Sequence, residues 1–539
     1  MIHGLIINNL PYVFLLVITF FADFVQGDYP NKKAESPSNE AVIIDDQGLS
    51  RLFYINRPGN ADRVMSMDWT GEKWSNPREE FIIPGQAYYA LQLAESQTED
   101  LICVFHVFGT GANGYRGRHL DLWINRRVKG KWETPFKIYE GYVGAIRGFN
   151  KLSSGRLLLT FGRAVPERET SPKEGNIDYG WNTIISMYSD DNGHSWQLSN
   201  NEIEIQIDNS KATRYGAIEP DIVELENGII WMLIRNTSGL LYQSSSIDGG
   251  ATWECPAPTS FISSDSPASF LRLNNGKLVL FWNSCQRWDD RNSYAMGGRD
   301  VLHAAISSDD GLNWEGAREV AFESGEIEIV EKGDRGTAYP SAVEDRDGNI
   351  LLVTGQGISR GLYKINSSWL EEKHQKRYIS IIDKLLIPSK LFQKTHGDTL
   401  FFSTSQTTDL VINFPTSMIG SVEIGPLPAA EWCNLNFALT DHFSPSADSS
   451  AFSNSVFHFL WSEIFEDKAP PSKKEFKLTF EWTLSEQGGE LQILVDGKAL
   501  QTVYAKRPPL LGINYIRINS ESGFYGINKL ISVVSKRID

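Results

Sequence analysis

A carboxylate, a phenol and several arginines in this sequence have types and a spacing that could serve one chemical site. Glu219 lies in the run Ala-Ile-Glu-Pro-Asp at the expected start of an inner strand, where burying a carboxylate is costly unless it has a purpose. Arg235 follows 16 residues later (235 − 219), and Arg299 and Tyr339 precede later strands. Carboxylates accept protons, and arginines bind anionic ligands through charge-assisted hydrogen bonds. These residues are therefore the first candidates for a functional site.

The overall charge limits what such a site could bind. The chain has 539 residues, with 51 Lys and Arg against 67 Asp and Glu, and a net charge of −16. A nucleic acid or an anionic membrane surface is therefore excluded as a partner on global grounds, whereas a small anionic ligand needs arginines that outweigh this field locally. The four cysteines lack a C-x-x-C spacing, so we expect buried thiols, no metal and no cofactor.

Three copies of one turn motif indicate which elements position these residues. The pattern S-x-D-x-G-x-x-W begins at Ser189, Ser246 and Ser307, so successive copies start 57 and 61 residues apart (246 − 189 and 307 − 246). The Ser and Asp side chains can bond backbone amides within a tight turn, and Gly supplies a positive φ. The Trp is expected to pack the turn between neighbouring sheets. This period is long enough for one four-stranded sheet per repeat.

The same order of strand, tight turn and strand recurs around these motifs and continues before and after them. Glycine turns separate the apolar runs and predict hairpins. They are Ser154-Gly155, Asn227-Gly228, Asn275-Gly276 and Asp347-Gly348. We count about six units, at roughly 40–78, 86–135, 143–197, 217–254, 267–315 and 338–372. Radial repetition of such sheets predicts an all-β fold with a six-bladed β-propeller over residues 28–372.

The chain after the repeats has a different character. Residues 373–384 are expected to be a polar linker. Residues 385–539 show alternating strands without the turn motif, which predicts a C-terminal β-sandwich, a lectin-like accessory domain.

The N-terminus carries an export signal in this interpretation. Residues 13–22 are apolar except for one Thr, and Gly27 follows, which is typical of a signal peptide over residues 1–27. We therefore expect a secreted, periplasmic or extracellular protein without a membrane span in the mature chain, because no other stretch could cross a bilayer.

The repeats resemble those of the Asp-box, or bacterial neuraminidase repeat, proteins, and the second half of the chain resembles the sialidase superfamily. The likeness is good over roughly residues 140–360 and poor before them. Sialidases carry a glutamate at the start of an inner strand and an arginine about one hairpin later, which Glu219 and Arg235 match. A further arginine before a turn motif and a tyrosine that opens the last blade match Arg299 in Gly-Gly-Arg and Tyr339 in Ala-Tyr-Pro-Ser.

The resemblance implies a role for each of these residues. Sialidases use a tyrosine as nucleophile, because the substrate's own carboxylate lies beside the reacting carbon and would repel a negative group. Tyr339 would attack and Glu219 would take its proton, which removes a cost of roughly 4 kcal/mol for ionising a phenol at pH 7. Arg235 and Arg299 would clamp the substrate carboxylate.

The first half of the chain matches less well. The nearest likeness to the family's first arginine is Arg147, in Ile-Arg-Gly-Phe before Gly-Arg-Leu-Leu, but the expected proline is missing. Arg147 also falls in the third unit, only 72 residues before Glu219 (219 − 147). In the same local register, Asp178 matches the general acid. If the first unit is the true equivalent, Asp62 would be the acid, and Asp121 is a third candidate.

Three functions of different classes stay open. The first is an exo-α-sialidase-like glycosidase that releases a terminal acidic sugar from a glycan or glycoconjugate, with Asp178 protonating the leaving group. The second is a propeller polysaccharide lyase or another glycosidase, in which His106, Arg116 and His119 would act beside a uronate. The third is a non-catalytic carbohydrate-binding protein that keeps the pocket.

Overall fold

The structure, a computed structural model, describes most of the chain between residues 30 and 538. The residues that it does not describe are 1–29, 59, 96–99, 110–119, 142, 166–180, 207–215, 287–297, 324–335, 381–391, 396–398, 404–407, 429–434, 445–451, 465–474, 521–529 and 539. The expected signal peptide over residues 1–27 lies outside the described residues.

The fold is nearly all-β, which confirms the predicted class. The helices α2 (Ser367–Leu370) and α4 (Trp461–Ile464) span only four residues each. Within the described residues, the strands form eight sheets. Six sheets of four or five strands come from residues 31–366, and two sheets of six strands come from residues 374–537.

Each of the six smaller sheets is built from strands that are consecutive in the chain, with one exception in the sixth sheet. The first sheet contains β2 (Val42–Asp46), β3 (Leu49–Asn56), β4 (Arg63–Asp68) and β5 (Arg78–Ile82). The second sheet contains β6 (Ala87–Glu95), β7 (Leu101–Phe108), β8 (Leu120–Val128), β9 (Lys131–Trp132) and β10 (Phe136–Tyr139). The third sheet contains β11 (Val143–Lys151), β12 (Leu157–Val165), β13 (Trp181–Ser189) and β14 (Gln197–Leu198). The fourth sheet contains β15 (Ile218–Glu224), β16 (Ile230–Arg235), β17 (Leu240–Ser246) and β18 (Ala257–Ile262). The fifth sheet contains β19 (Ser269–Arg272), β20 (Leu278–Trp282), β21 (Val301–Ser307) and β22 (Glu315–Phe322). The sixth sheet contains β23 (Ser341–Glu344), β24 (Asn349–Thr354), β25 (Gly361–Asn366) and, as the exception, β1 (Asn31–Glu35).

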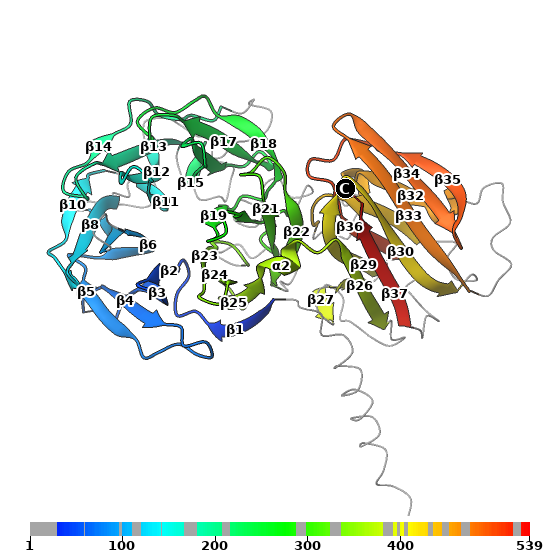
Figure 1. Cartoon of the computed structure of the whole chain (residues 1–539), viewed down its shortest axis with the longest axis horizontal. Coiled ribbons are helices and arrows are strands. Elements are labelled where there is room, and N and C mark those ends of the chain that lie inside the picture. The colour runs from blue at the N-terminus through cyan, green and yellow to red at the C-terminus, as the bar shows by residue number, and fades with distance from the viewer. Residues whose placement is uncertain are drawn as a thin grey trace, which may run out of the picture.

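The six smaller sheets close a ring. Their first strands contact one another in chain order, from β2 through β6, β11, β15 and β19 to β23, and β23 returns to β2. Figure 1 shows these strands toward the centre of the ring. Each predicted repeat unit corresponds to one sheet, and the four glycine turns join the first two strands of their sheets as predicted. The strand β1, which was not predicted, pairs antiparallel with β25 and ties the start of the described chain to the sixth sheet.

The three S-x-D-x-G-x-x-W motifs form the turns between the third and fourth strands of the third, fourth and fifth sheets. In each turn the Ser hydroxyl donates to the Asp carboxylate at 2.8 Å and accepts the Gly N–H, and the Asp accepts an N–H four residues later. Trp253 of the fourth sheet packs with Leu158 of the third, and its indole N–H donates to Ser186 Oγ at 2.9 Å. The tryptophan therefore joins neighbouring sheets.

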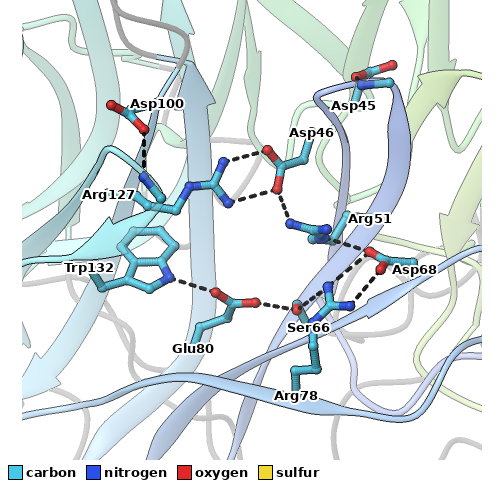
Figure 2. Close-up of polar contacts among 12 residues, drawn as sticks. Asp45, Asp46, Arg51, Ser66, Asp68, Arg78, Glu80, Asp100, Arg127 and Trp132 are labelled. Carbon is cyan, nitrogen blue, oxygen red and sulfur yellow. Dashed lines mark hydrogen bonds and ion pairs between the residues drawn. The ribbon is translucent and has the colours of Figure 1, made fainter.

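The first and second sheets lack this motif and are joined by buried charges. Asp46 at the end of β2 accepts hydrogen bonds from Arg127 of β8 and from Arg51 of β3. Asp68 accepts from the same Arg51 at 2.6 Å and from Arg78 of β5 at 2.7 Å. Figure 2 shows carboxylates and guanidinium groups alternating along this contact. Removing one partner of such a network leaves a buried charge without compensation.

Two six-stranded sheets make up the C-terminal part of the structure (Figure 1). One contains β26 (His374–Ser380), β37 (Leu530–Arg537), β30 (Ile419–Pro428), β33 (Glu475–Ser485), β34 (Gly488–Val495) and β35 (Lys498–Tyr504), and the other contains β27 (Phe392–Thr395), β28 (Thr399–Ser403), β29 (Thr408–Ser417), β36 (Ile513–Ser520), β31 (Leu435–Thr440) and β32 (Phe457–Leu460). Side chains from both sheets share one hydrophobic core. The segment 373–384, which we expected to be a linker, contains β26, because its polar run forms an edge strand rather than a connection.

A buried polar contact links the fifth sheet of the ring to the C-terminal strand β36. Tyr515 donates to Glu319 Oε1 at 2.7 Å, and its hydroxyl lies 2.6 Å from His303 Nε2. The backbone N–H of Ser284 donates to His303 Nδ1 at 3.3 Å, which places the imidazole proton on Nε2. The Tyr515 hydroxyl, the Glu319 carboxylate and the His303 imidazole therefore each have a partner. Phe443 adds backbone hydrogen bonds from the C-terminal part, including its N–H to the carbonyl of Ser284 at 2.9 Å.

Candidate functional site

The described candidate residues meet at the end of the ring where the inner strands begin. Glu219 is the second residue of β15, and Tyr339 lies two residues before β23. Both have left-handed backbone conformations, with φ of 48° and 62°. Such a conformation costs a non-glycine residue about 1–3 kcal/mol and persists where the surroundings impose it, often at functional sites. The strain therefore supports a functional role at this end of the ring.

Tyr339, Glu219 and Arg235 form one buried hydrogen-bonded group. The Tyr339 hydroxyl donates to Glu219 Oε1 at 2.9 Å. Arg235 Nη1 donates to the Tyr339 hydroxyl oxygen at 3.1 Å and to Glu219 Oε2. The phenol thus has a proton acceptor on one side and a cation beside its oxygen. This arrangement can pass the phenolic proton to Glu219 while Arg235 stabilises the negative charge that develops on oxygen.

Arg147 and Arg299 complete the surroundings of the phenol. Their guanidinium carbons lie 5.6 Å and 5.5 Å from the centroid of the Tyr339 ring. Arg147 Nη2 donates to the carbonyl of Pro340. Arg147 comes from the third sheet and Tyr339 from the sixth, which stand across the ring from each other (Figure 1). The short sequence distance between Arg147 and Glu219 is therefore no obstacle, because a ring brings all its inner strands to one centre.

Two residues that the sequence did not single out accept hydrogen bonds from the arginines of the site. Asp265 lies between β18 and β19, where its Oδ1 accepts Arg235 Nε at 2.7 Å and its backbone carbonyl accepts Arg299 Nη2 at 3.1 Å. Gln356 follows β24, and its Oε1 accepts Arg299 Nη1 at 2.9 Å. Both stand in connections outside any motif. The only signal in the sequence is a polar residue close to the start or end of a predicted strand.

Glu40 is a third residue that the sequence did not single out. It lies two residues before β2, as Tyr339 lies two residues before β23, and the two strands contact each other. Like Glu219 and Tyr339 it is buried and has a positive φ, of 50°. Its charge is among the groups that raise the pKa of Tyr339. The site therefore holds a second carboxylate near the phenol.

The surroundings change the proton affinity of two site groups. Burial, followed by the charge of Glu219, raises the pKa of Tyr339 well above its usual value near 10, and Arg235 and Arg299 oppose this shift. The phenol is therefore neutral at rest and gives up its proton only when a base accepts it during a reaction. Burial also raises the pKa of Asp221, against the charge of Arg147.

The three candidates for the proton donor differ in their surroundings. Asp178 lies outside the described residues. Asp62 precedes β4 at the same end of the ring, and its Oδ2 accepts the backbone N–H of Ala87 at 2.6 Å. Asp121 is bound by Lys137 of the outer strand β10, with an N···O distance of 3.0 Å. The Asp121 carboxylate is therefore engaged by the outer strand.

The alternative histidine cluster receives little support. His106 is fully buried in the second sheet, with its ring edge against Tyr88 at a centroid distance of 5.8 Å. Arg116 and His119 lie outside the described residues. A buried imidazole packed between strands is not placed to act on a polymer.

The described residues also bear on metal binding and on membrane insertion. Among the residues with described positions, no group of three or more His, Cys, Asp or Glu could hold a metal ion. Cys103 and Cys285 are buried as expected, whereas Cys255 is exposed. In the part of the chain that the structure describes, no helix has the length and apolar character needed to span a bilayer.

Comparisons with known proteins place the sequence in context. The family model described as BNR repeat-like domain matches residues 64–352. No curated protein matches the sequence significantly. Among solved structures, the chain is similar to a protein of unknown function from Dyadobacter fermentans DSM 18053, at 16% identity over 62% of this chain and 95% of that chain, with a TM-score of 0.42. It is also similar to Trypanosoma rangeli sialidase in complex with 2,3-difluorosialic acid, at 12% identity over 95% of this chain and 96% of that chain, with a TM-score of 0.43. A third similar structure is the leech intramolecular trans-sialidase complexed with 2,7-anhydro-Neu5Ac, at 12% identity over 64% of this chain and 71% of that chain, with a TM-score of 0.43.

Proposed function

Because the chain belongs to the BNR repeat-like domain family, as its three turn motifs predicted, we propose that it is a secreted glycosidase of the exo-α-sialidase kind. It would release a terminal acidic sugar from a glycan or glycoconjugate. One observation carries the proposal: the Tyr339 hydroxyl is bonded to Glu219 and Arg235 while Arg147 and Arg299 lie near its ring. A phenol, a carboxylate base and a group of arginines are the parts that a tyrosine-dependent glycosidase needs.

The proposed function goes together with a division of the chain into two domains. The ring of six sheets is a six-bladed β-propeller within residues 28–372, and the two larger sheets are a β-sandwich accessory domain that begins with β26. The closed circuit of inner strands supports the propeller, and the core shared by the two larger sheets supports the sandwich. The propeller brings inner strands from all six sheets to one centre, which suits a site assembled from separate repeats.

The first half of the reaction forms a covalent intermediate. The arginines hold the carboxylate of the sugar, and the Tyr339 oxygen attacks the anomeric carbon while Glu219 accepts the phenolic proton. The bond from the anomeric carbon to the leaving oxygen breaks, and Asp178 gives that oxygen a proton. In the second half, water attacks the anomeric carbon and gives a proton to Asp178. Tyr339 leaves and recovers its proton from Glu219, so the configuration at the anomeric carbon is retained.

Hydrolysis of an aryl α-sialoside tests this function. The variant Tyr339→Phe removes the nucleophilic oxygen and keeps the ring, so kcat should fall by at least about 10³-fold. Tyr504→Phe makes the same change at a residue that is 73% exposed on β35, and it should retain full activity. The assignment is wrong if the wild-type protein hydrolyses no acidic glycoside or if Tyr339→Phe keeps its activity. Binding of sialic acid without turnover would favour a non-catalytic carbohydrate-binding protein.

A further inference from the structure

The backbone before Tyr339 is held by hydrogen bonds from the sixth sheet. Residues 336–338 lead into Tyr339, which lies two residues before β23. All three carbonyl groups of this segment accept hydrogen bonds from the end of β24 and the residues after it. The donors are the Gln356 N–H at 2.8 Å, the Thr354 hydroxyl at 2.6 Å and the Gly355 N–H at 3.1 Å. The left-handed conformation of Tyr339 is therefore imposed by a segment with little freedom to rotate.

A carboxylate from the fifth sheet joins this segment to the turn after β24. Glu323 directly follows β22 and is 7% exposed. Its Oε1 accepts the N–H of Gly336 at 3.1 Å. Its Oε2 accepts the N–H of Ser359 at 3.0 Å and the hydroxyl of the same residue at 2.6 Å. One buried side chain thus fixes both the segment before Tyr339 and the turn that bonds to it.

The turn after β24 is shaped to lie against this carboxylate. A Cβ atom at Gly357 would overlap the Glu323 carboxylate, so a larger residue would push the carboxylate away. The Tyr363 hydroxyl donates to the Ser359 carbonyl at 2.8 Å and holds the turn from β25. Burying a carboxylate is costly unless it is hydrogen-bonded, and the turn supplies two of its three donors. The close fit therefore gives Glu323 a fixed place beside the segment that carries Tyr339.

The same kind of contact occurs at the opposite end of the ring. Glu224 is the last residue of β15, whereas Glu219 lies near the start of that strand, at the site. The Glu224 carboxylate accepts the N–H and the hydroxyl of Ser153, each at 2.6 Å. Both Glu323 and Glu224 thus join neighbouring sheets through the N–H and hydroxyl of one serine. Glu224 is therefore a matched control for a role that depends on closeness to Tyr339.

We propose that Glu323 is a positioning residue that holds Tyr339 in place to meet its base Glu219, acting through the backbone of residues 336–338. With this segment fixed, the phenol oxygen stays 2.9 Å from Glu219 Oε1. Proton transfer needs this distance, because a general base acts within about 2.6–3.2 Å of the atom that gives up the proton. The fifth sheet thereby contributes to the reactivity of a residue at the start of the sixth. This inference rests on the proposed function, because it concerns the nucleophile of that reaction.

Glu323→Gln and Glu224→Gln are a matched pair of substitutions. Each replaces one acceptor oxygen by an amide NH₂ group, which cannot accept a hydrogen bond from an N–H or a hydroxyl. For each variant, kcat is measured on an aryl α-sialoside, and free sialic acid is titrated as a competitive inhibitor. Glu323→Gln should lower kcat by at least about tenfold, because a small misplacement of a reacting group is costly. It should keep the inhibition constant within about threefold, because binding needs no attack by Tyr339. Glu224→Gln should keep both quantities within about threefold.

Ser359→Ala and Ser153→Ala test the same two contacts by a smaller change. Each removes one hydroxyl that donates to a glutamate at 2.6 Å. Ser359→Ala should lower kcat by at least about threefold, and Ser153→Ala should leave it unchanged. If Glu323→Gln does not fold, as judged by thermal melting, this serine pair decides the question.

The outcomes distinguish this inference from the proposed function. If the wild-type protein neither hydrolyses the sialoside nor binds sialic acid, the proposed function fails and this inference fails with it. If the wild-type protein is active but folded Glu323→Gln keeps its kcat, the positioning role alone is overturned. It is equally overturned if Glu224→Gln lowers kcat as much as Glu323→Gln, because the loss would then follow from stability and not from the place of Tyr339.

Discussion

The proton donor can be identified because its importance depends on the leaving group. A nitrophenolate leaves without a proton, whereas the alkoxide of a disaccharide needs one, and a general acid contributes about 10²–10⁴-fold to such a step. We expect Asp178→Asn to slow cleavage of an alcohol-linked sialoside by roughly this factor and to leave cleavage of a nitrophenyl sialoside much less affected. The two rates are measured side by side on the same variant.

Asp62→Asn is the matched control for this prediction. The Asp62 carboxylate accepts the backbone N–H of Ala87, so the substitution should affect both substrates alike, through the local structure of the first sheet. A loss confined to the alcohol-linked substrate in Asp62→Asn would instead assign the acid to Asp62 and contradict the role given to Asp178.

At the scale of single residues, the sequence indicated the members of the site that lie at the ends of well-patterned strands. Glu219, Arg235 and Tyr339 could be chosen because a strand, a turn and a motif fix their places along the chain. Asp265 and Gln356 could not, because they matter only through contacts with arginines of other strands. No spacing along the chain encodes a contact that the ring creates.

At the scale of elements, Asp68 shows how charge stabilises the first sheet, where it accepts hydrogen bonds from Arg51 of β3 and Arg78 of β5. Burial alone would raise the pKa of Asp68, but hydrogen bonds from Arg78 and Arg51 outweigh it and lower the pKa to about 2 (Figure 2). An unfolded Asp titrates near pH 3.9, so the folded state gains stability that is fully present above about pH 4 and is lost as the pH falls toward 2. This shift corresponds to about 2 kcal/mol.

We therefore predict that Asp68→Asn lowers the free energy of unfolding at pH 7 by about 2 kcal/mol. Between pH 4 and pH 2.5, the variant should then lose less of its free energy of unfolding than the wild-type protein does. Urea denaturation at the three pH values measures both effects. Asp190→Asn is the control, because Asp190 is 53% exposed where it pairs with Arg156, and a surface pair contributes less than about 1 kcal/mol. Equal effects of the two substitutions would contradict the importance of the partly buried network around Asp68.

One physical reason explains why the sequence did not predict the strands β1 and β26. The hairpins of the six sheets follow from alternating strands and glycine turns, which are local signals. The strand β1 finds its partner β25 at the other end of the ring, and β26 is a polar edge strand of a later sheet. Both form through pairing with distant strands, and neither carries a local pattern strong enough to reveal it.

At the scale of the whole molecule, the ring and the C-terminal sheets share a buried interface. Apolar side chains from both parts, including Cys285 and Val301 from the ring and Val411, Phe443 and Tyr515 from the C-terminal part, form one cluster. Polar groups at the same place are satisfied across the boundary. Unfolding one part would expose the apolar surface and the polar groups of the other, so the two parts should lose their structure together.

Tyr515→Phe tests this coupling at its centre. The substitution keeps the ring but removes the hydroxyl that donates to Glu319 and accepts from His303 Nε2, so two buried polar groups lose a partner. Each such loss costs about 1–3 kcal/mol, and the free energy of unfolding should fall by at least about 2 kcal/mol. Scanning calorimetry should show one transition for the wild-type protein, and the same transition at a lower temperature for Tyr515→Phe. Tyr504→Phe, at an exposed position on β35, should leave it unchanged. Two separate transitions in the wild-type protein would show that the ring and the C-terminal sheets unfold independently despite their shared interface.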